Sequence, residues 1–231
     1  MNSQSRITAI GTYVPDQILS NNDLEKMIDT NDEWIVQRTG MKERRIANKE
    51  EYSSHLAIKA IENLCTTYKK NLEDIDCIIV ATTTADYVFP SVACQIQQYF
   101  NIPHTLAFDL NATCAGFTYG REVYKWATRT VPAGIKELLH TTNMQIDDID
   151  WFVPHSVNLR MIESICEKTE IPIQKTLTSV KYMGNTSSAS IPLALDLARK
   201  EGKLNNGDTL LLYGFGGGLT HLGLIVEWGL D

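Results

Sequence analysis

The sequence predicts an α/β protein built from two related halves, and three observations support this. Apolar runs typical of buried strands alternate with segments of helical periodicity. Residues 58–103 and 134–172 repeat one order of features: a helix, an acidic segment, a strand, a turn and a second helix that ends near Ile-Pro. Of the 231 residues, 43% are hydrophobic, which is enough for a sizeable core. We therefore expect mainly parallel sheets with helices on their faces, whose strand ends meet at a shared site.

In the first half, the clearest element is the helix Ser53–Tyr68, because its apolar residues recur at spacings of three and four. The charged run Met41–Arg45 is expected, on charge alone, to be a solvated loop. The other expected elements are a strand at Arg6–Tyr13, a short helix at Leu24–Ile28 with caps in Ser20–Asp23, a helix capped by Asn31 or Asp32 and ended by Gly40, a strand at Cys77–Ala81, a helix at Ser91–Phe100 and a strand at Thr105–Leu110.

In the second half, Pro132 lies inside the expected helix Glu122–His140 and should kink or break it. A helix at Ser187–Lys200 tolerates Pro192 if this residue falls in the first turn. The remaining expected elements are a strand at Trp151–Val153, a helix at Asn158–Lys168, and strands at Thr209–Tyr213 and Leu219–Val226 on either side of the glycine turn Gly214–Gly218.

Composition excludes several classes of function. The net charge of −7 argues against non-specific binding to nucleic acid or anionic membranes. The N-terminal residues are polar, and no stretch approaches the ~18 apolar residues of a membrane span, so we expect a cytoplasmic protein. The five cysteines form no C-x-x-C pair, and the five histidines show no metal-ligand spacing. We expect free thiols and no metal.

The stretch Thr105–Gly120 places a cysteine where a reactive one belongs. Its apolar first part predicts a buried strand, a polar turn follows, and Cys114 lies in the first turn of an expected helix. Amide groups at a helix N-terminus stabilise a thiolate and bind an oxyanion formed beside it. The alternative is a small buried residue, which is the commoner fate of cysteine.

Three further stretches accompany Cys114. His155 follows the expected strand Trp151–Val153, at the strand end where open α/β sheets bind ligands. Asn185 lies in a turn of small residues, and Gly214–Gly218 offers backbone amides that can approach a ligand closely. Each has an ordinary alternative: a structural histidine, an asparagine that bonds its own backbone, or a tight glycine turn.

Together these segments resemble β-ketoacyl-acyl-carrier-protein synthase III. The resemblance rests on Asn-Ala-Thr-Cys-Ala-Gly-Phe, Val-Pro-His-Ser-Val-Asn-Leu-Arg, Gly-Asn-Thr-Ser-Ser-Ala-Ser-Ile-Pro and Gly-Phe-Gly-Gly-Gly-Leu-Thr, with Thr30–Gly40 and Phe89–Ser91 in the same order along the chain. Elongating synthases have a second His in place of the Asn. The resemblance implies a thiolase-like fold of duplicated α/β halves in α-β-α-β-α layers, with halves at 1–120 and 121–231, both incomplete.

The resemblance also implies a reaction and roles for residues. Cys114 would take an acyl group from acyl-CoA, with the amides of Cys114 and Gly217 as the oxyanion hole. His155 and Asn185 would then stabilise the enolate formed when malonyl-acyl carrier protein loses CO2, and condensation would give 3-oxoacyl-acyl carrier protein in the first step of type II fatty-acid synthesis.

Binding roles follow in the same way. The positions for CoA would be Thr30, Trp34, Arg38 and Asn158; Phe89 would close the acyl pocket of a neighbouring subunit in a homodimer; and Arg160, Lys42 and Arg45 would meet the acidic carrier protein. No cofactor is expected, since acyl-CoA is a substrate. The primer, acetyl or a branched short acyl group, stays open because a few methylenes change binding by only about 1–3 kcal/mol each.

One feature departs from the family. Cys114 and His155 are only 41 positions apart, a gap several times shorter than in the family, so an internal segment is missing after about Gly120. Either the deletion is real, or the sequence is an incomplete record of a longer protein. We favour the second explanation, because a deletion would remove core strands from both sheets. It predicts that Gly120 and Arg121 are not bonded neighbours and lie much farther apart than ~3.8 Å.

Three alternatives remain. A papain-like hydrolase also uses Cys, His and Asn in this order, but the missing signal peptide, the odd number of cysteines and the α/β repeat disfavour it. A truncated, inactive homologue would bind carrier protein or pair with a full-length subunit. A starter-unit synthase of secondary metabolism would use the same triad for related chemistry.

Overall fold

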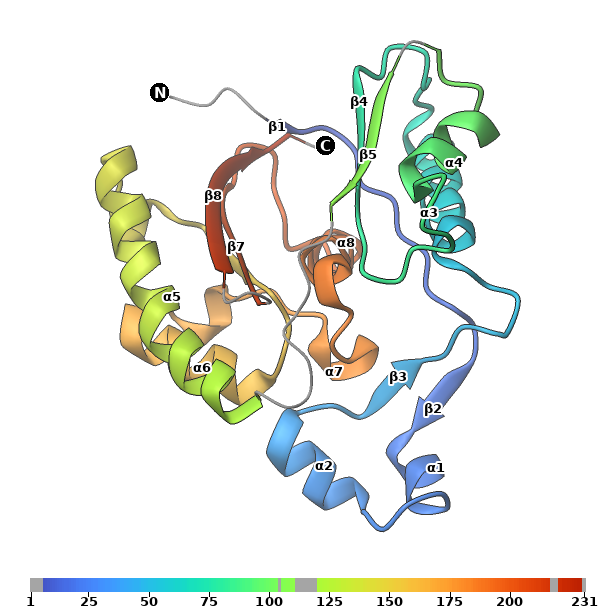
Figure 1. The fold of residues 1–231 in the computed structure, drawn as a ribbon. Coiled ribbons are helices and arrows are strands. Elements are labelled where there is room, and N and C mark those ends of the chain that lie inside the picture. The colour runs from blue at the N-terminus through green and yellow to red at the C-terminus, as the bar shows by residue number, and fades with distance from the viewer. Residues whose placement is uncertain (1–5, 104, 111–119, 217–219, 230–231) are drawn as a thin grey trace. The chain divides into compact units, whose positions relative to one another are not determined.

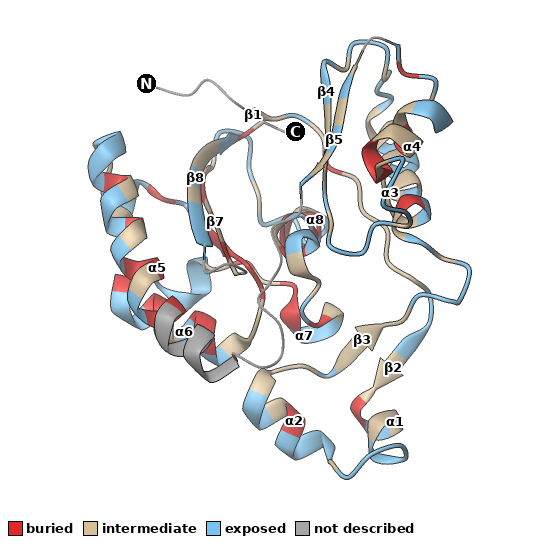
Figure 2. Ribbon diagram, viewed as in Figure 1, coloured by how far each residue is buried: buried red, intermediate tan, exposed pale blue. Residues whose placement is uncertain are grey.

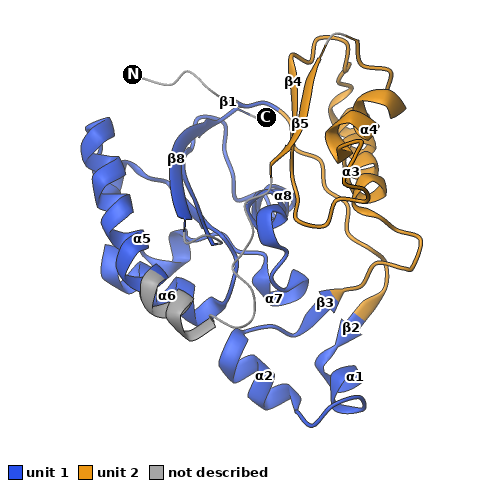
Figure 3. Ribbon diagram, in the orientation of Figure 1, with its two compact units in different colours: residues 1–8, 19–44, 114–231 blue, residues 9–18, 45–113 orange. Residues whose placement is uncertain are grey.

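The computed structural model describes residues 6–103, 105–110, 120–216 and 220–229 of the chain. These residues form two compact units (Figure 3), and each is described by itself. Unit 1 comprises residues 1–8, 19–44 and 114–231, and unit 2 comprises residues 9–18 and 45–113. The predicted halves, residues 1–120 and 121–231, are defined by the expected duplication of the fold and not by compactness. They stay a prediction.

Unit 1 is organised around a four-stranded sheet of order β1-β8-β7-β6 (Figure 1). Its strands are β1 (Arg6–Ile7), β6 (Trp151–Pro154), β7 (Thr209–Gly216) and β8 (Thr220–Trp228). β6 is parallel to β7, β7 and β8 are antiparallel, and β1 is parallel to β8. The three predicted strands of the second half are confirmed, and β7 extends into the glycine run as far as Gly216.

Helices cover the sheet on both faces. Helices α5 (Gly120–Thr142) and α6 (Leu159–Thr169) pack together on one side, whereas α8 (Ser190–Lys200) lies on the other (Figure 1). Short elements join them: α7 (Val180–Met183) and the 3₁₀ turns η2 (Ile146–Asp148), η3 (Ile173–Lys175) and η4 (Ser187–Ala189). Val131, Ile135, Phe152, Ile162 and Ile165 are fully buried between the helices and the sheet, and the buried positions follow the inner faces of α5 and α6 (Figure 2).

Helix α5 is not broken at Pro132, and the expected kink there stays a prediction. The helix is continuous through the proline, because Val131 and Ile135 on either side of it are fully buried and their packing offsets the lost backbone hydrogen bond. Gly120 and Arg121 are the first two residues of α5, so the wide separation predicted between them is not observed. The sequence after Arg121 has helical periodicity, and the helix runs back through this junction.

The N-terminal segments of unit 1 follow their capping residues. Helix α1 (Asn21–Glu25) begins at Ser20, whose hydroxyl accepts the backbone N–H of Asp23. Helix α2 (Asp32–Thr39) is capped by Asn31 and ends at Gly40 with φ of 76°, as predicted.

Two of the expected boundaries are wrong. α1 begins earlier than Leu24, because the Ser20 cap starts it at once. The strand expected at Arg6–Tyr13 stops at Ile7, because its partner strand ends at Trp228, opposite Ile7. The run Met41–Arg45, expected as a solvated loop, contains strand β3 (Glu43–Arg45), which pairs with β2 (Ile18–Ser20).

Unit 2 contains the parallel pair β4 (Cys77–Ala81) and β5 (Leu106–Leu110) with helices α3 (Ser53–Tyr68) and α4 (Val92–Tyr99). All four elements were predicted within one residue. The Asp109 carboxylate accepts the N–H groups of Val92 and Ala93, which ties the start of α4 to β5. The order α3, β4, α4 matches α5, β6, α6, as the internal repeat predicts.

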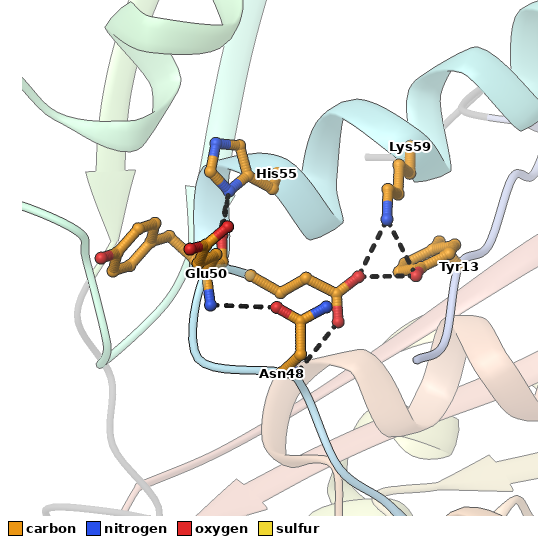
Figure 4. Close-up of polar contacts among 7 residues, drawn as sticks. Tyr13, Asn48, Glu50, His55 and Lys59 are labelled. Carbon is orange, nitrogen blue, oxygen red and sulfur yellow. Dashed lines mark hydrogen bonds and ion pairs between the residues drawn. The ribbon is translucent and has the colours of Figure 1, made fainter. Parts of the chain in front are cut away.

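A polar cluster connects the segment before β2 with α3 (Figure 4). The Glu51 carboxylate accepts hydrogen bonds from Tyr13 (2.7 Å), Lys59 (2.8 Å) and the backbone of Asn48 (3.1 Å). These donors, that of Lys59 above all, lower the pKa of Glu51 to about 2.

None of the helices in the described part of the chain combines the length and hydrophobicity that crossing a bilayer requires.

Candidate active site

His155 lies directly after β6, at the strand end where the sequence predicted it. Its backbone N–H donates to the carbonyl of Tyr213 (2.8 Å), which continues the parallel pairing with β7 by one residue. The N–H of Val157 then donates to the carbonyl of His155 (2.9 Å), so the chain turns sharply towards α6.

The imidazole of His155 is almost completely enclosed. Its exposed fraction is 4%, and Phe215 of β7 contacts the ring edge to face at 5.5 Å between centroids. Burial lowers the pKa of His155 to about 4, because a charged imidazolium is poorly solvated there. The side chain is therefore neutral at physiological pH, and a neutral imidazole donates a hydrogen bond from one ring nitrogen and accepts at the other.

Three buried serines next to this histidine are linked to one another by hydrogen bonds, and we call Ser156, Ser179 and Ser190 the serine cluster. Nδ1 of His155 lies 2.6 Å from Oγ of Ser190, which also accepts the backbone N–H of Ser156 at 3.1 Å. Oγ of Ser156 accepts the N–H of Ser179 (3.1 Å), and the Ser179 hydroxyl donates to the carbonyl of Ser190 (3.0 Å). The cluster joins the end of β6 to the starts of α7 and α8.

Asn185 lies in the turn between α7 and η4, and its side chain is exposed. Oδ1 of Asn185 accepts the backbone N–H of Ser187 (3.0 Å), so the ordinary alternative for an asparagine in a turn is realised. This contact occupies the oxygen of the amide and leaves its NH2 group as the donor. The chain from Asn185 leads through η4 into Ser190, which contacts His155.

Two of the predicted catalytic positions lie outside the described residues. These positions are Cys114, the expected nucleophile, and Gly217, the expected second residue of the oxyanion hole. Their roles stay predictions, as does the predicted turn and helix start around Cys114.

Residues predicted to bind CoA meet at the C-terminus of α2 and the N-terminus of α6. Trp34 and Arg38 are exposed one helical turn apart, with the Arg38 guanidinium 5.8 Å from the indole ring centre. Nδ2 of Asn158 donates to the carbonyl of Arg38 (3.1 Å), and its Oδ1 caps α6 through the N–H of Arg160 (2.9 Å). Positions 120 residues apart in sequence are thus joined directly. Thr30 precedes the cap of α2 and is half-buried.

The predicted carrier-protein contacts differ in exposure. Arg160 and Lys42 are exposed, and Arg160 borders a hollow of about 500 Å³ between α2 and α6. Arg45 is half-buried and donates to the carbonyl of Pro15 (3.2 Å), so part of its guanidinium is committed to the fold. In unit 2, Phe89 is 87% exposed and lines a hollow of about 390 Å³ beside Phe108 and Cys94.

Sequence reasoning missed the serine cluster. Ser156 stands next to His155, and Ser190 ends the run of small residues after Asn185. Both therefore lie within the motifs that carry the family resemblance. Only the folded arrangement shows that Ser190 reaches the imidazole. Among the residues that the structure describes, no group of three or more His, Cys, Asp or Glu side chains is placed to hold a metal ion.

Comparison with known proteins identifies relatives along the whole chain. Residues 139–228 match the model of the family described as 3-oxoacyl-[acyl-carrier-protein (ACP)] synthase III C terminal. Proteins named beta-ketoacyl-[acyl-carrier-protein] synthase III 2 from Bacillus anthracis and Bacillus cereus are each 64% identical, over 327 and 326 residues, and each alignment covers 100% of this chain and of the relative. The first alignment is 96 positions longer than the chain (327 − 231), which agrees with the expected missing internal segment.

Comparison of the fold with solved structures indicates the same family. The crystal structure of synthase III (FabH) from Thermus thermophilus has a TM-score of 0.91 and 31% identity, and the match covers 97% of this chain and 99% of that chain. This neighbour confirms the thiolase fold predicted from the motifs. The chain therefore belongs to the β-ketoacyl-acyl-carrier-protein synthase III family, the condensing acyltransferases that initiate type II fatty-acid synthesis.

Proposed function

We propose that this chain primes fatty-acid synthesis by condensing an acyl group from acyl-CoA with malonyl-acyl carrier protein. The observation that carries the proposal is His155, a neutral, buried imidazole at the end of β6 that is held by Ser190 and Phe215. A thioester enolate needs fixed hydrogen-bond donors in a site that excludes water, and a histidine kept neutral by burial supplies one.

The first step would be acyl transfer to Cys114. The thiolate attacks the thioester carbon of acyl-CoA, the carbonyl oxygen becomes an oxyanion next to the amides of Cys114 and Gly217, and CoA leaves as its thiolate. The exposed pair Trp34 and Arg38 supports binding of the nucleotide part of CoA, because an indole stacks on adenine and a guanidinium binds phosphate.

The second step would use malonyl-acyl carrier protein. Its terminal C–C bond breaks, CO2 leaves, and the electron pair remains as an enolate whose oxygen accepts hydrogen bonds from His155 and Asn185. The enolate carbon attacks the acyl-cysteine, and the Cys114 thiolate leaves. Asn185 fits this role because its Oδ1 is bound to Ser187, which leaves the NH2 group to donate.

The proposal extends to location and assembly. Arg160, Lys42 and Arg45 would meet the acidic carrier protein, with Arg160 and Lys42 the better exposed. Phe89, which is 87% exposed, would close the acyl pocket of a second copy in a homodimer. We place the reaction in the cytoplasm and without a cofactor beyond the two substrates.

The test is an intact-protein mass spectrum before and after incubation with acetyl-CoA and isobutyryl-CoA. We expect an acyl-sized increase in mass that disappears in Cys114→Ala and persists in Cys77→Ala, a control that removes an exposed thiol of β4. Release of CO2 from malonyl-acyl carrier protein should depend on His155. The proposal is wrong if the wild-type chain forms no adduct, or if the adduct survives in Cys114→Ala.

One observation favours a second candidate, an inactive subunit that pairs with a full-length homologue. One face of the β4–β5 pair is exposed and mostly apolar. Its large apolar residues are Ile79, Leu106, Phe108 and Leu110. Solvent-exposed apolar patches of this kind often mark an interface. Sedimentation of the chain mixed with the Bacillus anthracis relative tests this: a mixed dimer without acylation of Cys114 favours this candidate, whereas an acylated chain that does not mix excludes it.

A further inference from the structure

We propose that Ser190 is a positioning residue for His155: its hydroxyl donates to Nδ1 and thereby selects the tautomer that carries its proton on Nε2. The inference rests on the proposed function, because it explains how His155 becomes a donor to the enolate oxygen. It concerns a contact inside unit 1 whose residues are all described.

The direction of the hydrogen bond follows from the contacts of Ser190. Nδ1 and Oγ are 2.6 Å apart, so one of these atoms donates to the other. Oγ already accepts the N–H of Ser156 at 3.1 Å. If Nδ1 also donated, the Ser190 hydroxyl hydrogen would be buried with no acceptor among the described residues, which is unfavourable. The arrangement in which Ser190 donates satisfies both groups.

The hydroxyl is also held rigidly. Ser190 is the first residue of α8 and is 1% exposed. Its Oγ accepts the backbone N–H of Ser156, which lies directly after His155 in the chain. Since the same hydroxyl contacts both the imidazole and the adjacent backbone, it is fixed relative to the segment that carries His155.

The chemical consequence concerns charge at the enolate oxygen. With the proton on Nε2, the imidazole presents an N–H to the developing negative charge. In the other tautomer, the same atom presents a lone pair and repels that charge. A neutral histidine serves this reaction in the tautomer that is protonated on Nε2. The hydrogen bond made by the other ring nitrogen, Nδ1, selects that tautomer.

The tautomer can be measured directly by NMR of the full chain labelled with ¹⁵N-histidine, with His155→Gln used to assign the signal. At neutral pH we expect an unprotonated Nδ1 and a protonated Nε2 in the wild type. In Ser190→Ala we expect a mixture of tautomers. A protonated Nδ1 in the wild type would overturn the proposal, and this measurement does not depend on catalysis.

The kinetic test separates the two half-reactions. Ser190→Ala should slow CO2 release from malonyl-acyl carrier protein by about tenfold or more, which corresponds to about 1.4 kcal/mol. Acylation of Cys114 by acetyl-CoA should stay within about twofold of wild type, since His155 acts on the second substrate. Ser190→Thr keeps the hydroxyl and should recover most of the rate.

Ser179→Ala is the matched control, because it removes another buried hydroxyl of the serine cluster without touching His155. It should retain nearly the wild-type rate of CO2 release. Equal losses in Ser179→Ala and Ser190→Ala would show a purely structural effect and overturn the proposal. If the wild-type chain neither takes an acyl group nor releases CO2, the proposed function fails, while the NMR result still decides the role of Ser190.

Discussion

Burial of His155 makes the stability of unit 1 depend on pH. The pKa of His155 is about 4 in the folded chain and about 6.5 for an exposed histidine, because water cannot solvate a positive charge on the buried ring. As the pH falls below 6.5, the unfolded chain binds a proton that the folded chain does not. Folded-state stability is therefore highest above pH 6.5 and is lost as the pH falls to about 4, below which the loss is complete.

The size of the effect follows from the two pKa values. Each pH unit between them corresponds to about 1.4 kcal/mol, so the total loss is about 3 kcal/mol. A domain is typically stable by about 5–15 kcal/mol, so this is a large fraction of what holds the unit together. Asp23 and Glu51, whose pKa values are lowered to about 2 in the folded chain, begin to lose their stabilising effect only as the pH approaches their ordinary values of 3.8 and 4.5, and this loss is the same in wild type and in a variant of His155.

The assay is urea denaturation at several pH values between 7 and 4, followed by tryptophan fluorescence. All four tryptophans, Trp34, Trp126, Trp151 and Trp228, belong to unit 1, so the signal reports on its unfolding. His155→Gln is the comparison, because the glutamine cannot ionise. Between pH 7 and 4, the wild type should lose about 3 kcal/mol more free energy of unfolding than the variant.

An exposed histidine provides the control. His140 near the end of α5 is surrounded by solvent, and His140→Gln should retain the pH dependence of the wild type. Parallel pH profiles for wild type and His155→Gln would refute the reasoning, since they would mean that His155 accepts a proton in the folded chain as easily as in the unfolded chain.

Three further predictions concern packing and charge. Gly134→Ala should destabilise unit 1 by about 1–3 kcal/mol in urea titrations, despite the better helix propensity of alanine, because a β-carbon there overlaps the Tyr213 hydroxyl; a gain in stability would contradict this packing. Lys59→Met should raise the pKa of Glu51 from about 2 towards 4.5, as followed by carboxyl ¹³C NMR, and an unchanged midpoint would show that Lys59 is not the main cause. Phe152→Ala should cost about 3–5 kcal/mol because the ring is fully buried in the core, and a loss below about 1 kcal/mol would exclude that burial.

Local sequence signals were sufficient where one element decides its own boundaries. Helix α3 begins and ends where the apolar periodicity does, and α2 starts at Asn31 and ends at Gly40 because both caps are local. Strand β1 shows the opposite case. Its apolar sequence continues to Tyr13, but the strand stops at Ile7 because its length depends on where β8 ends, and no local signal contains that information.

The same distinction applies to the candidate site. The strand end that carries His155 was predictable, because an apolar run followed by Pro-His marks it in the sequence. The contact with Ser190 was not, because it joins residues 35 positions apart through the packing of α8. Asn158 is intermediate: its cap of α6 is local, whereas its bond to the carbonyl of Arg38 requires α2 to lie beside it.

This difference explains what a motif can and cannot supply. The motif around His155 identifies the residue type, but the type alone leaves two tautomers and a pKa near 6.5. Enclosure beside Phe215 lowers the pKa of His155 to about 4, and the Ser190 hydroxyl distinguishes the two ring nitrogens. A histidine in the same motif without this enclosure would be partly charged near neutral pH, and without Ser190 it would present a lone pair to the enolate part of the time. The chemistry of this site therefore depends on residues of α8 and β7 as much as on the histidine itself.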